Sequence, residues 1–282
     1  MNKPNLIIVE NMLMPIRGTL NRIANLKCEV KSISNLEGQT GLFIMAVAFV
    51  ESMHKEVLRY YLKYNPEKIT NKKTIEISKV LLVRNEDFYI LESLVDELID
   101  KMSYWQSMKI FYEILKIHKP ENLKTIESIQ KYRNQIIHKN MQIEYKQGSV
   151  NHMFPDIDYI LSSLSEYEKY LSDLNNKIYR KFSKFTRVNT LKNLWHYTFK
   201  TPFCKKFEDY WHIDLENDSI IGYKCPEYEK ELSHSESFML GIWRSQVSDC
   251  KVDFLNLSSL GKDVQSCLFM FLKLSNDIFM YK

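Results

Sequence analysis

Arginine, asparagine and histidine occur together in the short stretch RNQIIH, at residues 133–138. Arg133 keeps its charge at neutral pH and can bind a phosphate through two N–H groups. His138 titrates near neutrality, so it can move protons to and from a 2′-hydroxyl or a leaving oxygen. An arginine and a histidine at this spacing therefore suit phosphodiester chemistry.

The helix expected over residues 122–139 places Arg133 among apolar side chains. At about 100° per residue, the arginine falls in the middle of one face. That face carries Ile126, Ile129, Ile136 and Ile137. A buried arginine is costly unless an anion meets it. Either a carboxylate of the protein pairs with Arg133, or this helix borders a cleft that binds an anion.

Two residues of the long helix expected over 35–63 are candidate supports of this site. Glu51 is the carboxylate that we weigh as a partner for Arg133, although it also fits a solvated position beside Lys55. His54 lies one turn further along. On the motif helix, Asn134 and His138 are i, i+4 neighbours on the flank of the apolar stripe.

In this setting the sequence resembles the HEPN domain family. The RNQIIH stretch matches the R-x4-H motif of that family, including the polar residue that often follows the arginine. The long early helix, with SMHKEVLRYYL at residues 52–62, and the motif helix come in the order found in HEPN helical bundles. The resemblance covers residues 35–185.

The resemblance implies a metal-independent endoribonuclease effector of bacterial defence, abortive infection or a toxin–antitoxin pair. It implies that Arg133 and His138 are catalytic and that Asn134 orients His138 or the phosphate. A 2′-hydroxyl would attack the adjacent phosphate and leave a cyclic phosphate end. HEPN proteins usually form homodimers with a composite site, which suits two residues that lie about 140° apart on one helix.

Two other interpretations stay open at this stage. Some HEPN-like bundles are non-catalytic scaffolds that bind RNA or nucleotides, or are partner subunits of a defence complex. In that case Arg133 and His138 bind an anion or hold an interface. In the third interpretation the protein is purely structural, and Arg133 pairs internally with Glu51.

Residues 177–206 hold nine lysines and arginines and no acidic residue. Aromatic residues are interleaved with them: Tyr179, Phe182, Phe185, Trp195, Tyr197, Phe199 and Phe203. Basic groups neutralise phosphates and rings stack on unpaired bases, but the rings could equally belong to the core. If this stretch binds single-stranded or looped RNA such as tRNA, we expect Arg180, Lys181, Lys184 and Arg187 to guide it to the cleft. Lys131 and Lys139 of the motif helix are further expected contacts with RNA.

The sequence indicates no cofactor and no metal. Cys204, His212, Cys225 and His234 are separated by 7, 12 and 8 residues, which matches no common structural-zinc pattern. The glycine-rich nucleotide-binding motifs G-x-G-x-x-G and G-x-x-x-x-G-K-[ST] do not occur. The serine-hydrolase motif G-x-S-x-G and the zinc-protease motif H-E-x-x-H are also absent. The five cysteines are scattered, as is typical of reduced thiols.

The chain has only seven glycines and seven prolines, and 45% of its residues are hydrophobic. This composition predicts long helices joined by short loops. We expect a mainly α protein, with an HEPN-like helical bundle at 1–185 and a smaller C-terminal α+β module at 186–282. The module's hairpin is expected at WHIDLENDSIIGYK, with its turn at Asn217-Asp218. Predicted helices cover 5–26, 35–63, 86–102, 103–118, 122–139, 156–185, 188–199, 203–209, 234–247 and 262–276.

Four local features complete this prediction. A helix start or kink is expected near Pro15, and Asn35 and Asn122 are expected to cap helices. Residues 66–84 form a basic connector, and a loop with Gly148 and Pro155 precedes the helix at 156–185. The longest apolar run, at residues 41–50, is too short for a membrane span of about 20 residues. With no signal peptide evident, we expect a cytoplasmic protein without membrane contact.

Overall fold

The computed structural model describes residues 4–65, 68, 90–138, 142–146, 149–152, 154–200, 206–214, 219–222, 229, 231–245 and 262–279. The chain forms two compact units. The helical unit comprises Glu10–Ser183, and the terminal unit comprises Met1–Val9 together with Lys184–Lys282. The first residues therefore belong with the end of the chain, whereas the sequence placed them in the N-terminal domain.

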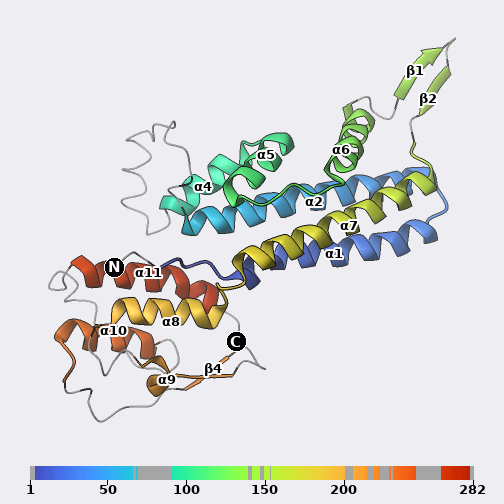
Figure 1. The fold of residues 1–282 in the computed structure, drawn as a ribbon. Coiled ribbons are helices and arrows are strands. Elements are labelled where there is room, and N and C mark those ends of the chain that lie inside the picture. The colour runs from blue at the N-terminus through green and yellow to red at the C-terminus, as the bar shows by residue number, and fades with distance from the viewer. Residues whose placement is uncertain are drawn as a thin grey trace. The chain divides into compact units, whose positions relative to one another are not determined.

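The chain is mainly helical, and most of its helices lie in the helical unit (Figure 1). They are α1 (Val9–Ser32), α2 (Leu36–Tyr64), α4 (Ile90–Asp100), α5 (Tyr104–Leu115), α6 (Leu123–His138) and α7 (Ile157–Phe182). No helix among the described residues combines the length and the apolar character needed to cross a bilayer.

Helix α2 is the centre of the helical unit. It begins after Asn35, whose side-chain oxygen accepts a hydrogen bond from the Gly38 amide at 2.6 Å. Helices α4, α5, α6 and α7 all contact it, and Figure 1 shows it running through the middle of the unit. Its Phe43, Val47, Val50 and Val57 are fully buried. The predicted bounds of 35–63 are confirmed to within a residue.

Two local predictions in this unit differ from the structure. Helix α1 covers Val9–Ser32 rather than 5–26, and Pro15 lies inside it, so a helix start near Pro15 is wrong while a kink there stays a prediction. Burial of Met12, Leu13 and Ile16 offsets the backbone bond that proline cannot make. Asn122 precedes α6, but its side-chain amide donates to the backbone and the carboxylate of Glu166 on α7, each at 3.0 Å. A contact between distant segments therefore replaces the expected cap.

The segment before α7 also differs from its prediction as a loop. Residues Gln142–Lys146 (β1) pair antiparallel with Ser149–His152 (β2), and Tyr145 lies opposite Val150. The pattern QIEYK alternates polar and apolar residues over a length that favours a short strand. Gly148 and the basic connector, except Lys68, lie outside the described residues.

The terminal unit has an aromatic core around Trp195. Its elements are α8 (Arg187–Thr198), α9 (Phe207–Tyr210), β3 (His212–Asp214), β4 (Ser219–Gly222), α10 (His234–Ser245) and α11 (Lys262–Phe279). Strands β3 and β4 pair antiparallel, and the residues between them, including Asn217-Asp218, lie outside the described part. The rings of Phe199, Phe207, Tyr210 and Trp243 surround Trp195 at centroid distances of 4.2–5.7 Å.

The N-terminal segment completes the terminal unit. Leu6, Ile7 and Ile8 are buried, at 6%, 0% and 0% exposure. The Thr190 hydroxyl of α8 donates to the Ile7 carbonyl at 2.8 Å, and the Val9 amide donates to the Phe185 carbonyl at 2.8 Å. These bonds satisfy backbone groups that would otherwise be buried unpaired.

Candidate active site on helix α6

Arg133 lies in the buried stripe of α6, as the helical periodicity predicted. Ile126, Ile129 and Ile136 are 0%, 3% and 0% exposed, and Arg133 between them is half-buried. Its Nη1 donates to Oδ1 of Asn134 at 3.0 Å, and its buried Nε has no hydrogen-bond partner. Among the described residues no carboxylate pairs with this guanidinium. Asn134 is thus the residue that positions it.

Tyr167 lies close to Arg133 and Tyr104 lies close to Tyr167, and sequence reasoning missed both. The guanidinium interacts electrostatically with Tyr167 of α7, and Tyr167 interacts in the same way with Tyr104 of α5. Both hydroxyls are buried without a hydrogen-bond partner, as is Oε1 of Gln130 on α6. Burial raises the pKa of both tyrosines, so both are neutral. Each occupies a buried position of its own amphipathic helix, as ordinary core residues do, so no local signal marked them.

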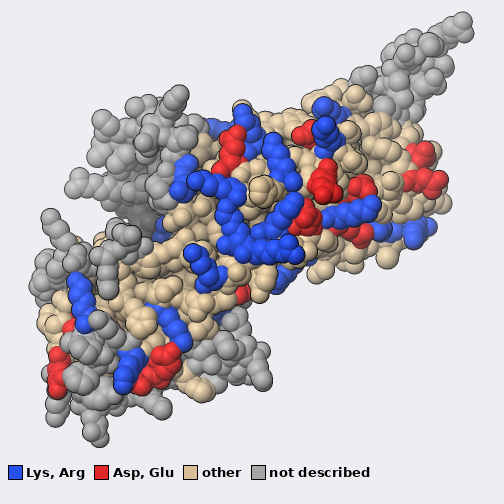
Figure 2. Space-filling view, in the orientation of Figure 1, with Lys and Arg blue, Asp and Glu red and all other residues tan. Residues whose placement is uncertain are grey.

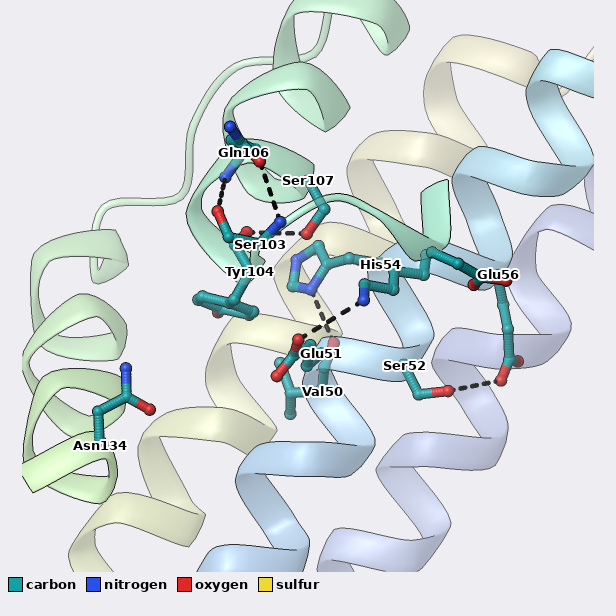
Figure 3. Close-up of polar contacts among 12 residues, drawn as sticks. Val50, Glu51, Ser52, His54, Glu56, Ser103, Tyr104, Gln106, Ser107 and Asn134 are labelled. Atoms are coloured by element: carbon teal, nitrogen blue, oxygen red, sulfur yellow. Dashed lines mark hydrogen bonds and ion pairs between the residues drawn. The ribbon is translucent and has the colours of Figure 1, made fainter. Parts of the chain in front are cut away.

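Glu51 approaches this group from α2 but does not pair with Arg133. Its Oε1 lies 3.7 Å from Nζ of Lys55, one turn along the same helix. The carboxylates of Glu51 and Glu127 add to the rise in the pKa of Tyr104, after burial and the neighbouring tyrosines. In Figure 3, Asn134 projects from α6 toward the side on which Tyr104 and Glu51 lie. Glu51 therefore lies near the site as a partner of Lys55.

His54 is part of the core and leaves no ring nitrogen for a substrate. It is 0% exposed, and its Nδ1 lies 2.7 Å from the Val50 carbonyl (Figure 3). Its Nε2 lies 2.5 Å from the Tyr170 hydroxyl. The Tyr170 oxygen lies 2.7 Å from that of Tyr112. Burial lowers the pKa of His54 to about 4, so the ring is neutral at pH 7. The supporting role expected of His54 is limited to holding α2 against α7.

His138 is the last residue of α6 and is exposed. Ile137 beside it is 37% exposed, although the sequence placed it in the core stripe. Helical side chains lean toward the preceding turn, and α6 ends at His138, so no later residue of the helix covers Ile137. Lys131 is exposed on the same helix, and Lys139 lies outside the described residues.

The basic residues expected to contact RNA belong to both units. Arg180 and Lys181 are exposed at the end of α7 in the helical unit. Lys184 and Arg187 belong to the terminal unit, where Lys184 is exposed and Arg187 is half-buried.

Three of the six described rings among these interleaved aromatics serve the core. Trp195 and Phe199 are 0% exposed and Phe182 is 5% exposed. Phe185 and Tyr197 are half-buried, and Tyr179, at 52%, is the exposed member of this set among the described residues. Phe203 lies outside the described residues. For Phe182, Trp195 and Phe199 the core alternative is therefore confirmed, and stacking on bases stays a prediction for the exposed Tyr179.

A zinc site cannot be built from the described residues. Cys204 and Cys225 lie outside them, while His212 begins β3 and His234 begins α10. Within the described ranges no group of three or more histidines, cysteines or acidic residues could hold a metal ion. The described cysteines, Cys28 and Cys267, are free thiols.

Comparisons of the chain with models of known protein families, with curated proteins and with solved structures find no match.

Proposed function

We propose that the protein is a metal-independent endoribonuclease of the R-x4-H type, with Arg133 and His138 as its catalytic residues. The observation that carries the proposal is the state of Arg133. It is half-buried in an apolar stripe, held by Asn134, and has no carboxylate partner among the described residues. An unneutralised guanidinium in such a place is stabilised when an anion binds. A phosphodiester of single-stranded or looped RNA supplies that anion.

In the proposed reaction the 2′-oxygen bonds to phosphorus while the bond from phosphorus to the 5′-oxygen breaks. His138 takes the proton of the 2′-hydroxyl, and the leaving 5′-oxygen takes a proton from water. Arg133 neutralises the charge that builds up on the phosphate. The products are a cyclic phosphate end and a 5′-hydroxyl end.

A site that uses both Arg133 and His138 requires two copies of the chain. Arg133 and His138 are about 7.5 Å apart along α6 and about 140° apart around it, so they do not face one atom from one helix. A homodimer that places the two α6 helices together would combine the arginine of one copy with the histidine of the other. Ile137, exposed beside His138, offers apolar surface for that contact.

Mixing two inactive variants tests both the chemistry and the composite site. Arg133→Ala and His138→Ala should each abolish cleavage of a mixed RNA pool in EDTA while keeping the fold. When the two are mixed and allowed to exchange, half of the dimers hold one intact site of two, so about a quarter of wild-type activity should return. No cleavage by the wild type, or cleavage that stops with chelator, would refute the proposal. A mixture that stays inactive would refute the composite site.

One observation favours the non-catalytic alternative, an RNA- or nucleotide-binding scaffold or a partner subunit of a defence complex. Among the described residues nothing hydrogen-bonds to the ring of His138, so no neighbour fixes its orientation or tautomer. This alternative predicts RNA binding that weakens with Arg133→Ala and with salt, without any cleavage. The same RNA assay separates the two functions.

A further inference from the structure

Several lysines and arginines lie together on the helical unit, apart from the proposed catalytic residues. They lie where the connection between α5 and α6 meets the end of α7. We call Lys116, Lys119, Lys177, Arg180 and Lys181 the basic cluster. In Figure 2, Lys and Arg side chains gather over the part of this unit where α7 and the α5–α6 connection lie in Figure 1.

Hydrogen bonds between α7 and the connection hold the cluster together. Nζ of Lys181 donates to the Lys116 carbonyl at 2.5 Å, and Nζ of Lys177 donates to the Lys119 carbonyl at 3.3 Å. Lys116 has a left-handed backbone, with φ of 50°, which ends α5 and turns the chain toward α7. The backbone at Lys116 and Lys119 is thereby held beside the cations of α7.

Acidic residues neutralise little of this charge. Asp173 pairs with Lys177 at 2.7 Å, and Glu121 is exposed in the connection. Lys116, Arg180 and Lys181 make no ion pair with a described residue, and neither does Lys119. Burial, and after it the nearby charge of Lys116, lower the pKa of Lys181, so both desolvation and like charge disfavour its charged form. A polyanion that binds here would offset the like charge.

We propose that the basic cluster binds the phosphate backbone of single-stranded RNA and leads it toward α6, an inference that rests on the function proposed above. Helix α6 starts at Leu123, directly after the connection. Arg133 lies about 15 Å further along its axis. The cluster and the catalytic residues can therefore be spanned by one strand, since grooves for single strands hold about 4–16 nucleotides.

The test is binding of a labelled single-stranded oligonucleotide with 2′-O-methyl groups, which lacks the attacking hydroxyl. Fluorescence anisotropy would be measured at several salt concentrations. The variant K119Q/R180Q removes two cluster charges while leaving the Lys119 carbonyl in place. The control R17Q/K31Q removes one arginine and one lysine that are exposed on α1. Circular dichroism checks that all proteins are folded.

Each phosphate contact contributes about 0.7 to the slope of log affinity against log salt for single strands, so K119Q/R180Q should flatten the slope by about 1.4. Between about 50 and 200 mM salt, the wild type and R17Q/K31Q should lose about seven-fold more affinity than K119Q/R180Q. Equal slopes for all three proteins would overturn the inference. If the slopes agree but His138→Ala still abolishes cleavage, the ribonuclease stands without this surface. If K119Q/R180Q weakens binding and no RNA is cut, the surface stands and the ribonuclease fails.

Discussion

Two buried tyrosines on α7 should respond in opposite ways to the loss of their hydroxyl groups. Tyr167 and Tyr170 are both 0% exposed and lie on one face of the helix. The Tyr170 hydroxyl joins a chain of hydrogen bonds. Because Nδ1 of His54 donates to the Val50 carbonyl, Nε2 must accept, so the Tyr170 hydroxyl donates to it and accepts from Tyr112. The Tyr167 hydroxyl has no hydrogen-bond partner.

Removing the Tyr170 hydroxyl leaves two buried groups unpaired, Nε2 of His54 and the hydroxyl of Tyr112. A buried polar group left without its partner costs about 1–3 kcal/mol. We therefore expect Tyr170→Phe to lower the free energy of unfolding by about 2–4 kcal/mol. Tyr167→Phe removes a hydroxyl that is already buried without a bond, so stability should stay the same or rise by about 1 kcal/mol.

Urea unfolding followed by circular dichroism measures the difference between the two variants. Tryptophan fluorescence is the internal control, because Trp195, Trp211 and Trp243 belong to the terminal unit and only Trp105 belongs to the helical unit. The fluorescence transition should hardly move, while the transition of the helical unit shifts. If Tyr167→Phe destabilised the protein as much as Tyr170→Phe, the hydroxyls would not differ in bonding and the reasoning would be refuted.

Arg133→Met should change the free energy of unfolding by less than about 1 kcal/mol, because Arg133 makes no ion pair with Glu51. Breaking such a buried pair would cost about 3–5 kcal/mol. A loss of that larger size in urea unfolding would restore the purely structural interpretation. His54 takes up a proton more readily in the unfolded chain, since burial lowers its pKa from 6.5 to about 4. Stability should therefore fall by about 3 kcal/mol as pH drops from 6.5 toward 4, and urea unfolding at several pH values should show a flatter profile for His54→Asn. In the terminal unit, the Glu236 carboxylate accepts from the Ser233 amide at 3.2 Å and its hydroxyl at 2.7 Å. Glu236→Ala should lower stability by about 2 kcal/mol, read from tryptophan fluorescence, and an unchanged midpoint would contradict this.

The long helices could be predicted from the sequence because their signals are local. Asn35 caps α2 and Asp156 caps α7, where its Oδ1 accepts from the Tyr159 amide at 2.6 Å. Such caps and a long apolar stripe act within a few turns of the chain. Asn122, like Asn35, is an asparagine at the start of a helix, but its side-chain amide donates to Glu166, 44 residues away. Only the packing of α6 on α7 decides that outcome, so no window of sequence contains it.

The strand pair β1–β2 was missed for a related reason. Each strand has only four or five residues, so the alternation of polar and apolar residues repeats too few times to distinguish a strand from a polar loop. The register, in which Tyr145 pairs with Val150, is evident only once the backbone is known. Short elements depend on their partners more than on their own sequence.

The candidate site was predictable in one respect and not in another. Periodicity alone placed Arg133 in the buried stripe of α6, because the positions of Ile129 and Ile136 fix that face. What meets the arginine there depends on α7. Along that helix Tyr170 faces His54, which offers an acceptor, whereas Tyr167 faces Arg133, which offers none. Two tyrosines three residues apart thus differ because of residues on other helices.

The helical unit consequently holds two polar layers with different properties. In the first, every hydrogen-bonding group of the His54 ring and the Tyr170 hydroxyl is used, which fixes α2 against α7. In the second, Arg133, Tyr104 and Tyr167 each keep a buried polar atom without a partner. Natural proteins tolerate such groups mainly where they serve a function, and the cost is borne by the rest of the fold. The satisfied layer gives the rigidity that holds the unsatisfied one in place, so the polar groups around Arg133 are where we expect an incoming phosphate to bind.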